Sequence, residues 1–189
     1  CLSLLEGFFA FAVYDTLQND LFIARDRFGK KPLHFYKDND VFVFASELKA
    51  IFAFDIPKQL NYEALRLYLQ FAYIPQPLSI LRHVIKLSPG SYLTLINGVI
   101  AEKKWYNLPL YTDYSRAVSY EAAQAELEKL LEEAVVKRLI SDVPLGAFLS
   151  GGIDSSVVVA LACRHKDALN TFSIGFKGEQ FFDETHFAE

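Results

Sequence analysis

The N-terminal part of the chain alternates between apolar runs and short polar breaks. Each run has the length of a β-strand, and the breaks carry turn residues such as Asn19-Asp20. The pattern predicts an antiparallel meander of four strands: Phe8 to Asp15, Leu21 to Asp26, Pro32 to Tyr36, and Val41 to Ser46. Because these runs are apolar on both faces, we expect the sheet to be covered by another sheet on one side and by helices on the other.

The middle of the chain changes to a helical period and then returns to strands. Residues 60–73 place apolar side chains at 62, 65, 69 and 72 behind Asn61, a candidate N-cap, which predicts an amphipathic helix. Further on, Asn97-Gly98 is the strongest two-residue signal for a β-hairpin. It joins two predicted strands, residues 91–96 and 99–102.

The last third of the chain predicts an α/β arrangement. Ser119 is a candidate N-cap for a helix that continues to about Ile140. Residues 143–148 are typical of a buried strand, residues 155–164 of a helix that is apolar nearly all round, and residues 169–176 of the next strand. A crossover of this length is right-handed, so the two strands should be parallel and their carboxyl ends should share one edge. Ligands bind at such an edge.

Between the first of these strands and its helix stands Leu149-Ser150-Gly151-Gly152-Ile153-Asp154-Ser155-Ser156. In a strand-to-helix turn, backbone N–H groups converge, the helix dipole favours negative charge, and glycine lets a phosphate approach closely. Ser150, Ser155 and Ser156 add hydroxyl groups, and the Asp154 carboxylate is suited to Mg²⁺ that bridges to phosphate oxygens. The spacing differs from both G-x-x-x-x-G-K-[ST] and G-x-G-x-x-G. We therefore predict a phosphate-binding loop of another kind.

Composition excludes several classes of function. The net charge is −4, and Lys and Arg are scattered, which argues against a nucleic-acid partner. No apolar run has the length of a membrane span, and no secretion signal opens the chain. Two distant cysteines favour a reducing cytoplasm, with Cys163 as a small core residue. The four histidines are isolated from one another, so we expect no metal site from them. Since Met is absent even at position 1, we expect an excised fragment.

The loop Ser150 to Ser156 resembles the pyrophosphate loop of N-type ATP pyrophosphatases, which cleave ATP to AMP and pyrophosphate. Three earlier blocks, Glu6 to Asp15, Ala24 to Leu33 and Phe44 to Ala50, are similar in order and spacing to the later half of the glutamine-hydrolysing domain of class II asparagine synthetases. The segment from Leu87 to Leu93, followed by Trp105 and Tyr106, resembles the closing hairpin of that domain. We expect these two aromatic residues at the domain junction.

The resemblance implies a fold class of two partial domains, α/β and α+β. Residues 1–106 would be the remnant of an antiparallel, β-rich Ntn-hydrolase-type glutaminase domain, residues 107–118 a linker, and residues 119–189 the start of a parallel-sheet α/β ATP-pyrophosphatase domain. The glutamine-binding segments of the family are absent, and Cys1 is not followed by the family's nucleophile pattern. We therefore expect Cys1 to be no nucleophile, the catalytic residues to lie outside the chain, and the fragment alone to be inactive.

For the full enzyme, the resemblance implies the ATP-dependent conversion of aspartate to asparagine through a β-aspartyl-AMP intermediate, with ammonia taken from glutamine. ATP and Mg²⁺ are the implied cofactors, Asp154 is the implied metal ligand, and a homodimer is compatible with the resemblance. The implied ATP-binding residues are Leu149, Ser150, Gly151, Gly152, Ile153, Asp154, Ser155, Ser156 and Ile174.

Three alternatives remain open at the level of sequence. The enzyme could act on another carboxylate, or it could belong to NAD or GMP synthesis, against which the block from Phe8 to Lys49 argues. The third alternative is an inactive module that keeps the fold. We expect Arg25, Asp26 and Arg27 to form a turn held by salt bridges and caps rather than to contact substrate, and Asp183 to cap a further helix.

Overall fold

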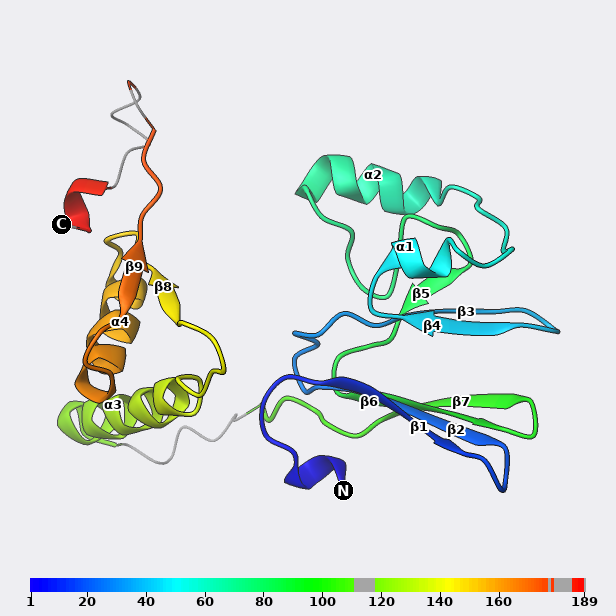
Figure 1. Cartoon of the computed structure of the whole chain (residues 1–189), viewed down its shortest axis with the longest axis horizontal. Helices are drawn as coiled ribbons and strands as arrows, with labels where there is room; N and C mark the ends of the chain where they lie inside the picture. Colours follow the sequence, from blue (N-terminus) through cyan, green and yellow to red (C-terminus); the bar gives the residue numbers. More distant parts are fainter. Residues whose placement is uncertain (111–117, 177, 179–184, 189) are drawn as a thin grey trace. The chain divides into compact units, whose positions relative to one another are not determined.

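The structure is a computed structural model that describes residues 1–110, 118–176, 178 and 185–188. The chain forms two compact units, residues 1–110 and residues 111–189 (Figure 1). Asp183 and most of the predicted linker, residues 111–117, lie outside the described residues. No described helix is long and apolar enough to cross a membrane.

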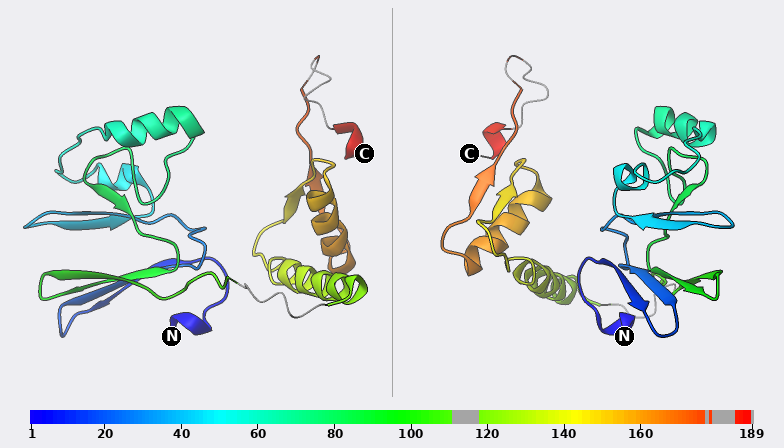
Figure 2. Two further views of the ribbon diagram at one scale, coloured as in Figure 1. Left: turned by 180° about the vertical axis from the view of Figure 1, so that it is seen from behind. Right: turned by 45° about the vertical axis from the view of Figure 1, so that its right-hand side comes forward.

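The first unit is built on two antiparallel sheets that lie one above the other (Figures 1 and 2). The four-stranded sheet has the order β1-β2-β6-β7, and its strands are Ala10–Asp15, Asp20–Arg25, Ser91–Ile96 and Val99–Lys104. The three-stranded sheet has the order β4-β3-β5, with β3 at His34–Lys37, β4 at Phe42–Ala45 and β5 at Val84–Lys86. A short 3₁₀ helix, Leu2–Leu4, precedes β1.

The prediction of one continuous meander is wrong, although the four predicted strands exist. β1 pairs with β2 and β3 pairs with β4, but the two hairpins belong to different sheets. The chain leaves the first sheet at the turn that begins with Asp26. There the backbone N–H groups of the turn donate to the Asp26 carboxylate instead of to a neighbouring strand. Cover on both sides, by contrast, is confirmed for the three-stranded sheet.

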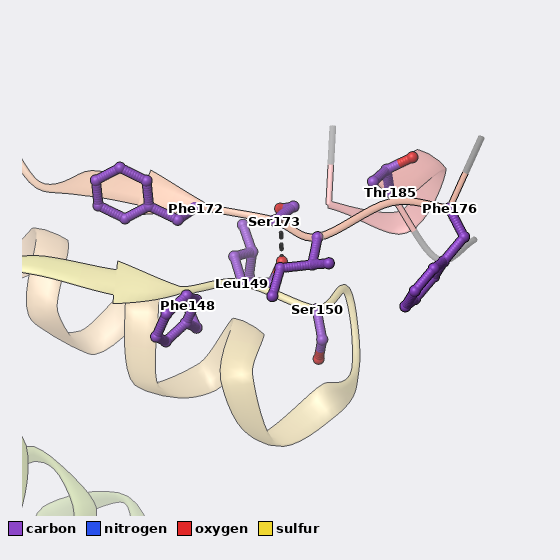
Figure 3. A pocket seen from close by; sticks show the side chains of 8 residues that line it. Phe148, Leu149, Ser150, Phe172, Ser173, Phe176 and Thr185 are labelled. Atoms are coloured by element: carbon purple, nitrogen blue, oxygen red, sulfur yellow. Dashed lines mark hydrogen bonds between the residues drawn. The ribbon is translucent and has the colours of Figure 1, made fainter. Parts of the chain in front are cut away.

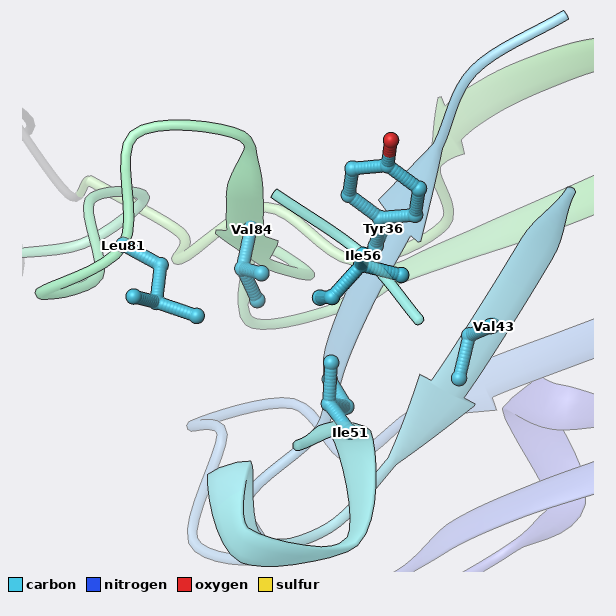
Figure 4. Close-up of a cluster of buried hydrophobic side chains, with 6 residues drawn as sticks. All are labelled: Tyr36, Val43, Ile51, Ile56, Leu81 and Val84. Carbon is cyan, nitrogen blue, oxygen red and sulfur yellow. The ribbon is translucent and has the colours of Figure 1, made fainter. Parts of the chain in front are cut away.

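Two hydrophobic clusters show how that cover is made. Between the sheets, Ile23 and Leu93 from the four-stranded sheet pack with Phe35 and Phe42 from the three-stranded sheet. On the other face of the three-stranded sheet, helices α1 (Leu48–Ile51) and α2 (Tyr62–Phe71) close the unit. The cluster on this side is shown in Figure 4 and consists of Tyr36, Val43, Ile51, Ile56, Leu81 and Val84.

Local signals fixed the ends of several elements. The Asn61 side chain accepts a hydrogen bond from the Ala64 N–H and so caps α2. Asn97 and Gly98, both with positive φ, form the two-residue turn between β6 and β7. The predicted apolar face of α2 is wrong, however, because Tyr62 and Leu69 are 77% and 76% exposed. The buried residue is Ala64, whose small side chain lets the helix approach the rest of the unit closely.

The second unit contains a strand–helix–strand segment whose two strands are parallel, as predicted. Helix α3 spans Tyr120–Val136 and is capped by Ser119, whose hydroxyl accepts from the Ala122 N–H. Strand β8 (Gly146–Phe148), helix α4 (Ile153–His165) and strand β9 (Asn170–Phe172) follow, and β8 pairs with β9 in parallel (Figure 1).

Burial in this unit is lower than the sequence predicts. α3 covers one side of α4 through Val135, Leu161 and Ala162, but Ile153 at the start of α4 is 83% exposed. Phe148 on β8 is 76% exposed, so the prediction of a buried strand and a helix buried all round is wrong. Cys163 is likewise exposed instead of being a core residue. The physical reason is that, in the part of the chain that the structure describes, two short strands and one helix cannot cover every face of α4.

Candidate functional site

The predicted loop lies where the carboxyl ends of β8 and β9 meet. Leu149 follows β8 directly, and its N–H donates to the carbonyl oxygen of Phe172 at 2.9 Å. From β9, the Ser173 hydroxyl donates to the carbonyl oxygen of Leu149 at 2.6 Å (Figure 3). The first bond extends the backbone pairing one residue past β8, and the second holds the same two segments together through a side chain. They bring Leu149 close to the chain segment that contains Ile174, as the sequence predicted.

Hydroxyl groups close the loop on itself. The Ser150 and Ser155 Oγ atoms are 3.1 Å apart, and the Ser155 hydroxyl also donates to the Gly152 carbonyl oxygen at 3.0 Å. The Gly152 N–H reaches the Ser150 Oγ at 3.4 Å. The shape of the turn is therefore fixed by bonds within the loop itself.

Helix α4 begins without a side-chain cap. Its N-cap residue is Gly152, whereas Asn61 and Ser119 cap α2 and α3 through their side chains. The first N–H groups of a helix have no partner within the helix, and the dipole makes this end positive. Because the N-cap is a glycine, the N–H groups of the first turn point into the space in front of α4 without a capping side chain. Such a helix end is suited to binding an anion.

The two glycines of the loop have different surroundings. Gly151 has φ +80°, a value that favours glycine, and a Cβ atom added there would lie 2.3 Å from the Cβ atom of Phe187. Gly152 has φ −69°, and an added Cβ atom would meet only the Ser150 Oγ at 3.4 Å. The close neighbour that excludes a side chain at Gly151 is thus Phe187, while the face of Gly152 is open.

A cavity of about 250 Å³ adjoins the loop (Figure 3). It is mainly apolar, and hydroxyl groups stand among its aromatic and aliphatic side chains. Its lining residues are Phe148, Leu149, Ser150, Phe172, Ser173, Ile174, Phe176 and Thr185. A flat apolar group with a polar attachment, such as a nucleoside, matches this lining.

The structure brings three of the predicted residues, Leu149, Ser150 and Ile174, to the cavity. The other predicted residues, from Gly151 to Ser156, form the rest of the turn and the first part of α4. Ser173, Phe176 and Thr185 were missed by the sequence reasoning. Ser173 and Phe176 lie near Ile174 in the sequence, so the position of that strand end could have indicated them. Thr185 has no such local signal, because it is distant from the loop in sequence and lies beside it only in the folded chain.

Asp154 is the residue predicted to bind Mg²⁺. It stands exposed in the first turn of α4, and no group of three or more His, Cys, Asp and Glu side chains that would enclose a metal occurs among the described residues. Mg²⁺ keeps several waters and is usually held by one or two carboxylates together with substrate phosphates. A single carboxylate beside the predicted phosphate-binding turn fits that mode of binding.

The Arg25 to Arg27 turn in the first unit is structural, as predicted, but its bonds are mainly to the backbone instead of salt bridges. The Asp26 carboxylate, 1% exposed, accepts from the N–H groups of Phe28, Lys30 and Lys31. Burial by itself would raise the pKa of Asp26, but these hydrogen bonds outweigh it and the pKa is lowered.

Arg25 is buried in the same turn. Its guanidinium donates to the carbonyl oxygens of Lys31 and Gly29, each at 2.7 Å. Desolvation by burial lowers the pKa of Arg25, and the neighbouring Asp26 acts in the opposite direction. With the nitrogens of its guanidinium bonded to backbone, Arg25 has a role in holding the turn.

Trp105 and Tyr106 pack inside the first unit. Trp105 stacks on Phe9 with ring centroids 6.0 Å apart, and its Nε1–H donates to the carbonyl oxygen of Arg25 at 3.1 Å. The guanidinium of Arg27 lies over both rings, 5.1 Å from the Trp105 centroid and 5.6 Å from the Tyr106 centroid. These contacts fasten the chain after β7 to the start of the unit.

Two family models match separate parts of the chain. The model of the glutamine amidotransferase domain matches residues 1–106, and the model of asparagine synthase matches residues 126–189. Among solved structures, the glutamine phosphoribosylpyrophosphate amidotransferase of Bacillus subtilis covers 94% of this chain at 16% identity with a TM-score of 0.34, which is too low to carry an argument about the fold.

Several curated relatives match nearly the whole chain. A Methanocaldococcus jannaschii protein, provisionally named glutamine-hydrolysing asparagine synthetase 2, is 40% identical over 98% of this chain and 36% of its own length. Asparagine synthetase 1 of Bacillus subtilis is 37% identical over 99% of this chain and 29% of its own length, and asparagine synthetase 2 of Arabidopsis thaliana is 34% identical over 94% and 27%.

The chain thus spans about a third of the length of these relatives. The family model of the glutamine amidotransferase domain covers 106 of the 189 residues of this chain. The chain therefore belongs to the glutamine amidotransferase family, and it shares with glutamine-hydrolysing asparagine synthetases the succession of an amidotransferase segment and an asparagine synthase segment.

Proposed function

We propose that this chain is part of a longer enzyme, called the full-length enzyme below, that makes asparagine from aspartate with ATP and with ammonia taken from glutamine. In this reaction ATP would adenylate the side-chain carboxylate of aspartate to give β-aspartyl-AMP and pyrophosphate. Ammonia would then displace AMP. The names of the relatives and the two family matches support this proposal.

One observation carries the proposal for the ATP site. Helix α4 starts on Gly152 without a side-chain cap, at the carboxyl edge of two parallel strands and beside a mainly apolar cavity. The positive helix end is suited to the phosphates, and the cavity is suited to the nucleoside. Both lie in the segment that matches the asparagine synthase model.

Several of the predicted loop residues have a role under this proposal. The N–H groups at the start of α4 would bind the departing pyrophosphate, and the mutual bonds of Ser150 and Ser155 hold the turn in shape before it arrives. Leu149 and Ile174 would present backbone groups and apolar side chains to the base at the ends of β8 and β9.

Asp154 would hold Mg²⁺ together with phosphate oxygens, since its exposed carboxylate stands in the first turn of the same helix. When bound, Mg²⁺ neutralises part of the phosphate charge and makes pyrophosphate a better leaving group. The chain's own contribution is to position the phosphates at the positive end of α4.

The test is an assay of products. The full-length enzyme is incubated with ATP, Mg²⁺, glutamine and aspartate, and the nucleotides and amino acids are followed by mass spectrometry. We expect AMP and asparagine to appear together, each dependent on aspartate. AMP formed only with another carboxylate would assign a different acceptor, and the absence of AMP with every acceptor would overturn the proposed activity.

A further inference from the structure

A segment distant in sequence packs onto the phosphate-binding loop. Residues Thr185–Phe187 form a turn of 3₁₀ helix, closed by a hydrogen bond from the Ala188 N–H to the Thr185 carbonyl oxygen at 2.9 Å. A Cβ atom at Gly151 would lie 2.3 Å from the Cβ atom, 2.8 Å from the carbonyl carbon and 3.0 Å from the Cα atom of Phe187. The main chain of Phe187 therefore rests directly on Gly151.

The same segment forms part of the wall of the cavity. Thr185 lines it together with Ser150, which belongs to the loop, and with Phe176, which follows β9 (Figure 3). A segment that rests on the loop at Phe187 thus places Thr185 at the same cavity as Ser150.

We propose that residues 185–188, called the strap here, position Thr185 at the nucleotide cavity, and that Gly151 is the seat that determines where the strap lies. This inference rests on the proposed function insofar as the ligand is ATP. Under this inference, position 151 must be glycine to leave room for Phe187, and not only to let a phosphate approach. The atoms that exclude a side chain there belong to Phe187. Thr185 is then a binding residue, and Gly151 and Phe187 are positioning residues.

The adjacent glycines provide a matched pair of variants. An added Cβ atom at Gly151 would come within 3.0 Å of backbone atoms of Phe187, so Gly151→Ala must displace the strap. An added Cβ atom at Gly152 would meet only the Ser150 Oγ at 3.4 Å, at a φ that alanine adopts readily, so Gly152→Ala should leave the strap in place. Alanine at Gly151 also takes φ +80°, which strains the turn itself. Exchange of the Ser156 amide, which donates to the Gly152 carbonyl oxygen at 3.0 Å, therefore reports on the loop and should stay unchanged while the strap opens.

The first measurement is hydrogen exchange by mass spectrometry of residues 185–188 in the nucleotide-free, full-length enzyme. We expect Gly151→Ala to speed exchange of the Ala188 amide about tenfold or more and Gly152→Ala to leave it unchanged, because local opening releases this hydrogen bond. If Gly151→Ala is folded by circular dichroism and its strap exchanges as slowly as that of wild type, Gly151 does not determine the position of the strap. Equal acceleration by both variants would lead to the same conclusion.

The second measurement is the dissociation constant of ATP. Loss of one hydrogen bond predicts that Thr185→Val weakens binding about three- to tenfold, while Thr185→Ser, which keeps the hydroxyl group, stays within about twofold of wild type. In the Gly151→Ala background, Thr185→Val should have no further effect, because the strap has already moved. Independent, additive effects of the two substitutions would contradict the positioning role.

The two measurements separate the strap from the proposed function. If wild-type full-length enzyme binds no ATP, the proposed function fails, while hydrogen exchange still decides whether Gly151 seats the strap. If ATP binds and Thr185→Val binds it as tightly as wild type does, the proposed function stands and the role of Thr185 is overturned. If Gly151→Ala does not fold, Phe187→Gly, which removes the nearest atom, is used in its place, and accelerated exchange is again the expected result.

Discussion

The indole Nε1–H of Trp105 donates a hydrogen bond to the carbonyl oxygen of Arg25 at 3.1 Å, across 80 positions of sequence. Trp105→Phe keeps an aromatic ring against Phe9 but removes this donor. We expect a loss of about 1 kcal/mol in the free energy of unfolding, the usual effect of one missing hydrogen bond. The measurement is urea denaturation of the 189-residue chain followed by far-ultraviolet circular dichroism.

Tyr106→Phe is the control for this substitution. It retains the ring that packs edge-on against Phe28 with centroids 5.9 Å apart. Its midpoint of denaturation should stay close to that of wild type. A similar loss in both variants would indicate that the effect is not specific to the bond from Trp105 to Arg25.

The hydrogen bonds accepted by Asp26 should make the free energy of unfolding depend on pH in the acid range. Asp26→Asn replaces a charged carboxylate that accepts three backbone N–H bonds by a neutral amide with a single oxygen acceptor. That oxygen can keep the Phe28 and Lys30 N–H groups, but the Lys31 N–H loses its acceptor. We expect unfolding to become easier by about 2 kcal/mol at pH 7, within the range for a lost hydrogen bond to a charged group. Denaturation in urea at pH 7 measures this loss.

The pH dependence of Asp26 follows from the direction of its pKa shift. Because its folded pKa is lowered, its contribution is fully present above the pKa of an unfolded aspartate, about 3.9. It is lost as the pH falls from there through the folded pKa. Wild type should therefore lose stability relative to Asp26→Asn in acid. A difference between the two proteins that is constant from pH 7 to pH 2 would contradict the lowered pKa.

His34 should make the free energy of unfolding depend on pH a second time, closer to neutral pH than Asp26 does. Burial is the main cause of its lowered pKa, and the charges of Lys86 and Arg25 add to it, although a hydrogen bond to the Ser46 carbonyl oxygen opposes them. Below about pH 6.5 the unfolded chain binds a proton that the folded chain does not. Stability should therefore fall as the pH decreases from about 6.5 to the folded pKa. His34→Gln should show no such fall, and equal slopes in both proteins between pH 8 and pH 5 would rule out His34 as the source.

Asp154 predicts a separation of the two proposed activities. In the full-length enzyme, Asp154→Asn should reduce ATP cleavage by about a hundredfold or more, since loss of metal-assisted charge stabilisation removes several kcal/mol. The release of ammonia from glutamine should continue. Asp167→Asn, an exposed carboxylate beyond the other end of α4, is the matched control and should retain both activities. Loss of both activities in Asp154→Asn, or of neither, would argue against separate sites.

Sequence reasoning succeeded where a few neighbouring residues decide the structure. Asn97-Gly98 suffices for a two-residue hairpin turn, and Asn61 and Ser119 each cap a helix by bonding to a backbone N–H three residues later. The loop from Leu149 to Ser156 stands between a strand and a helix, as predicted, because glycines and serines favour such a turn.

It failed where distant segments decide the structure. The face of α2 that is buried depends on what lies against it, and the Asn61 N–H is bound to the carbonyl oxygen of Ile80, which is remote in sequence. The change of sheet after β2 depends on Asp26, whose bonding partners could not be read from an apolar pattern. Thr185 and Phe187 reach the loop only because the chain folds back on it.

Arg27 fastens two segments that lie about as far apart in sequence as the first unit allows. Its guanidinium donates to the carbonyl oxygens of Ser3 and Leu5 and lies over the rings of Trp105 and Tyr106. Ends of a domain commonly fray independently of one another. Here fraying at one end removes contacts that hold the other, so the beginning and the end of the amidotransferase segment should open as a single cooperative event.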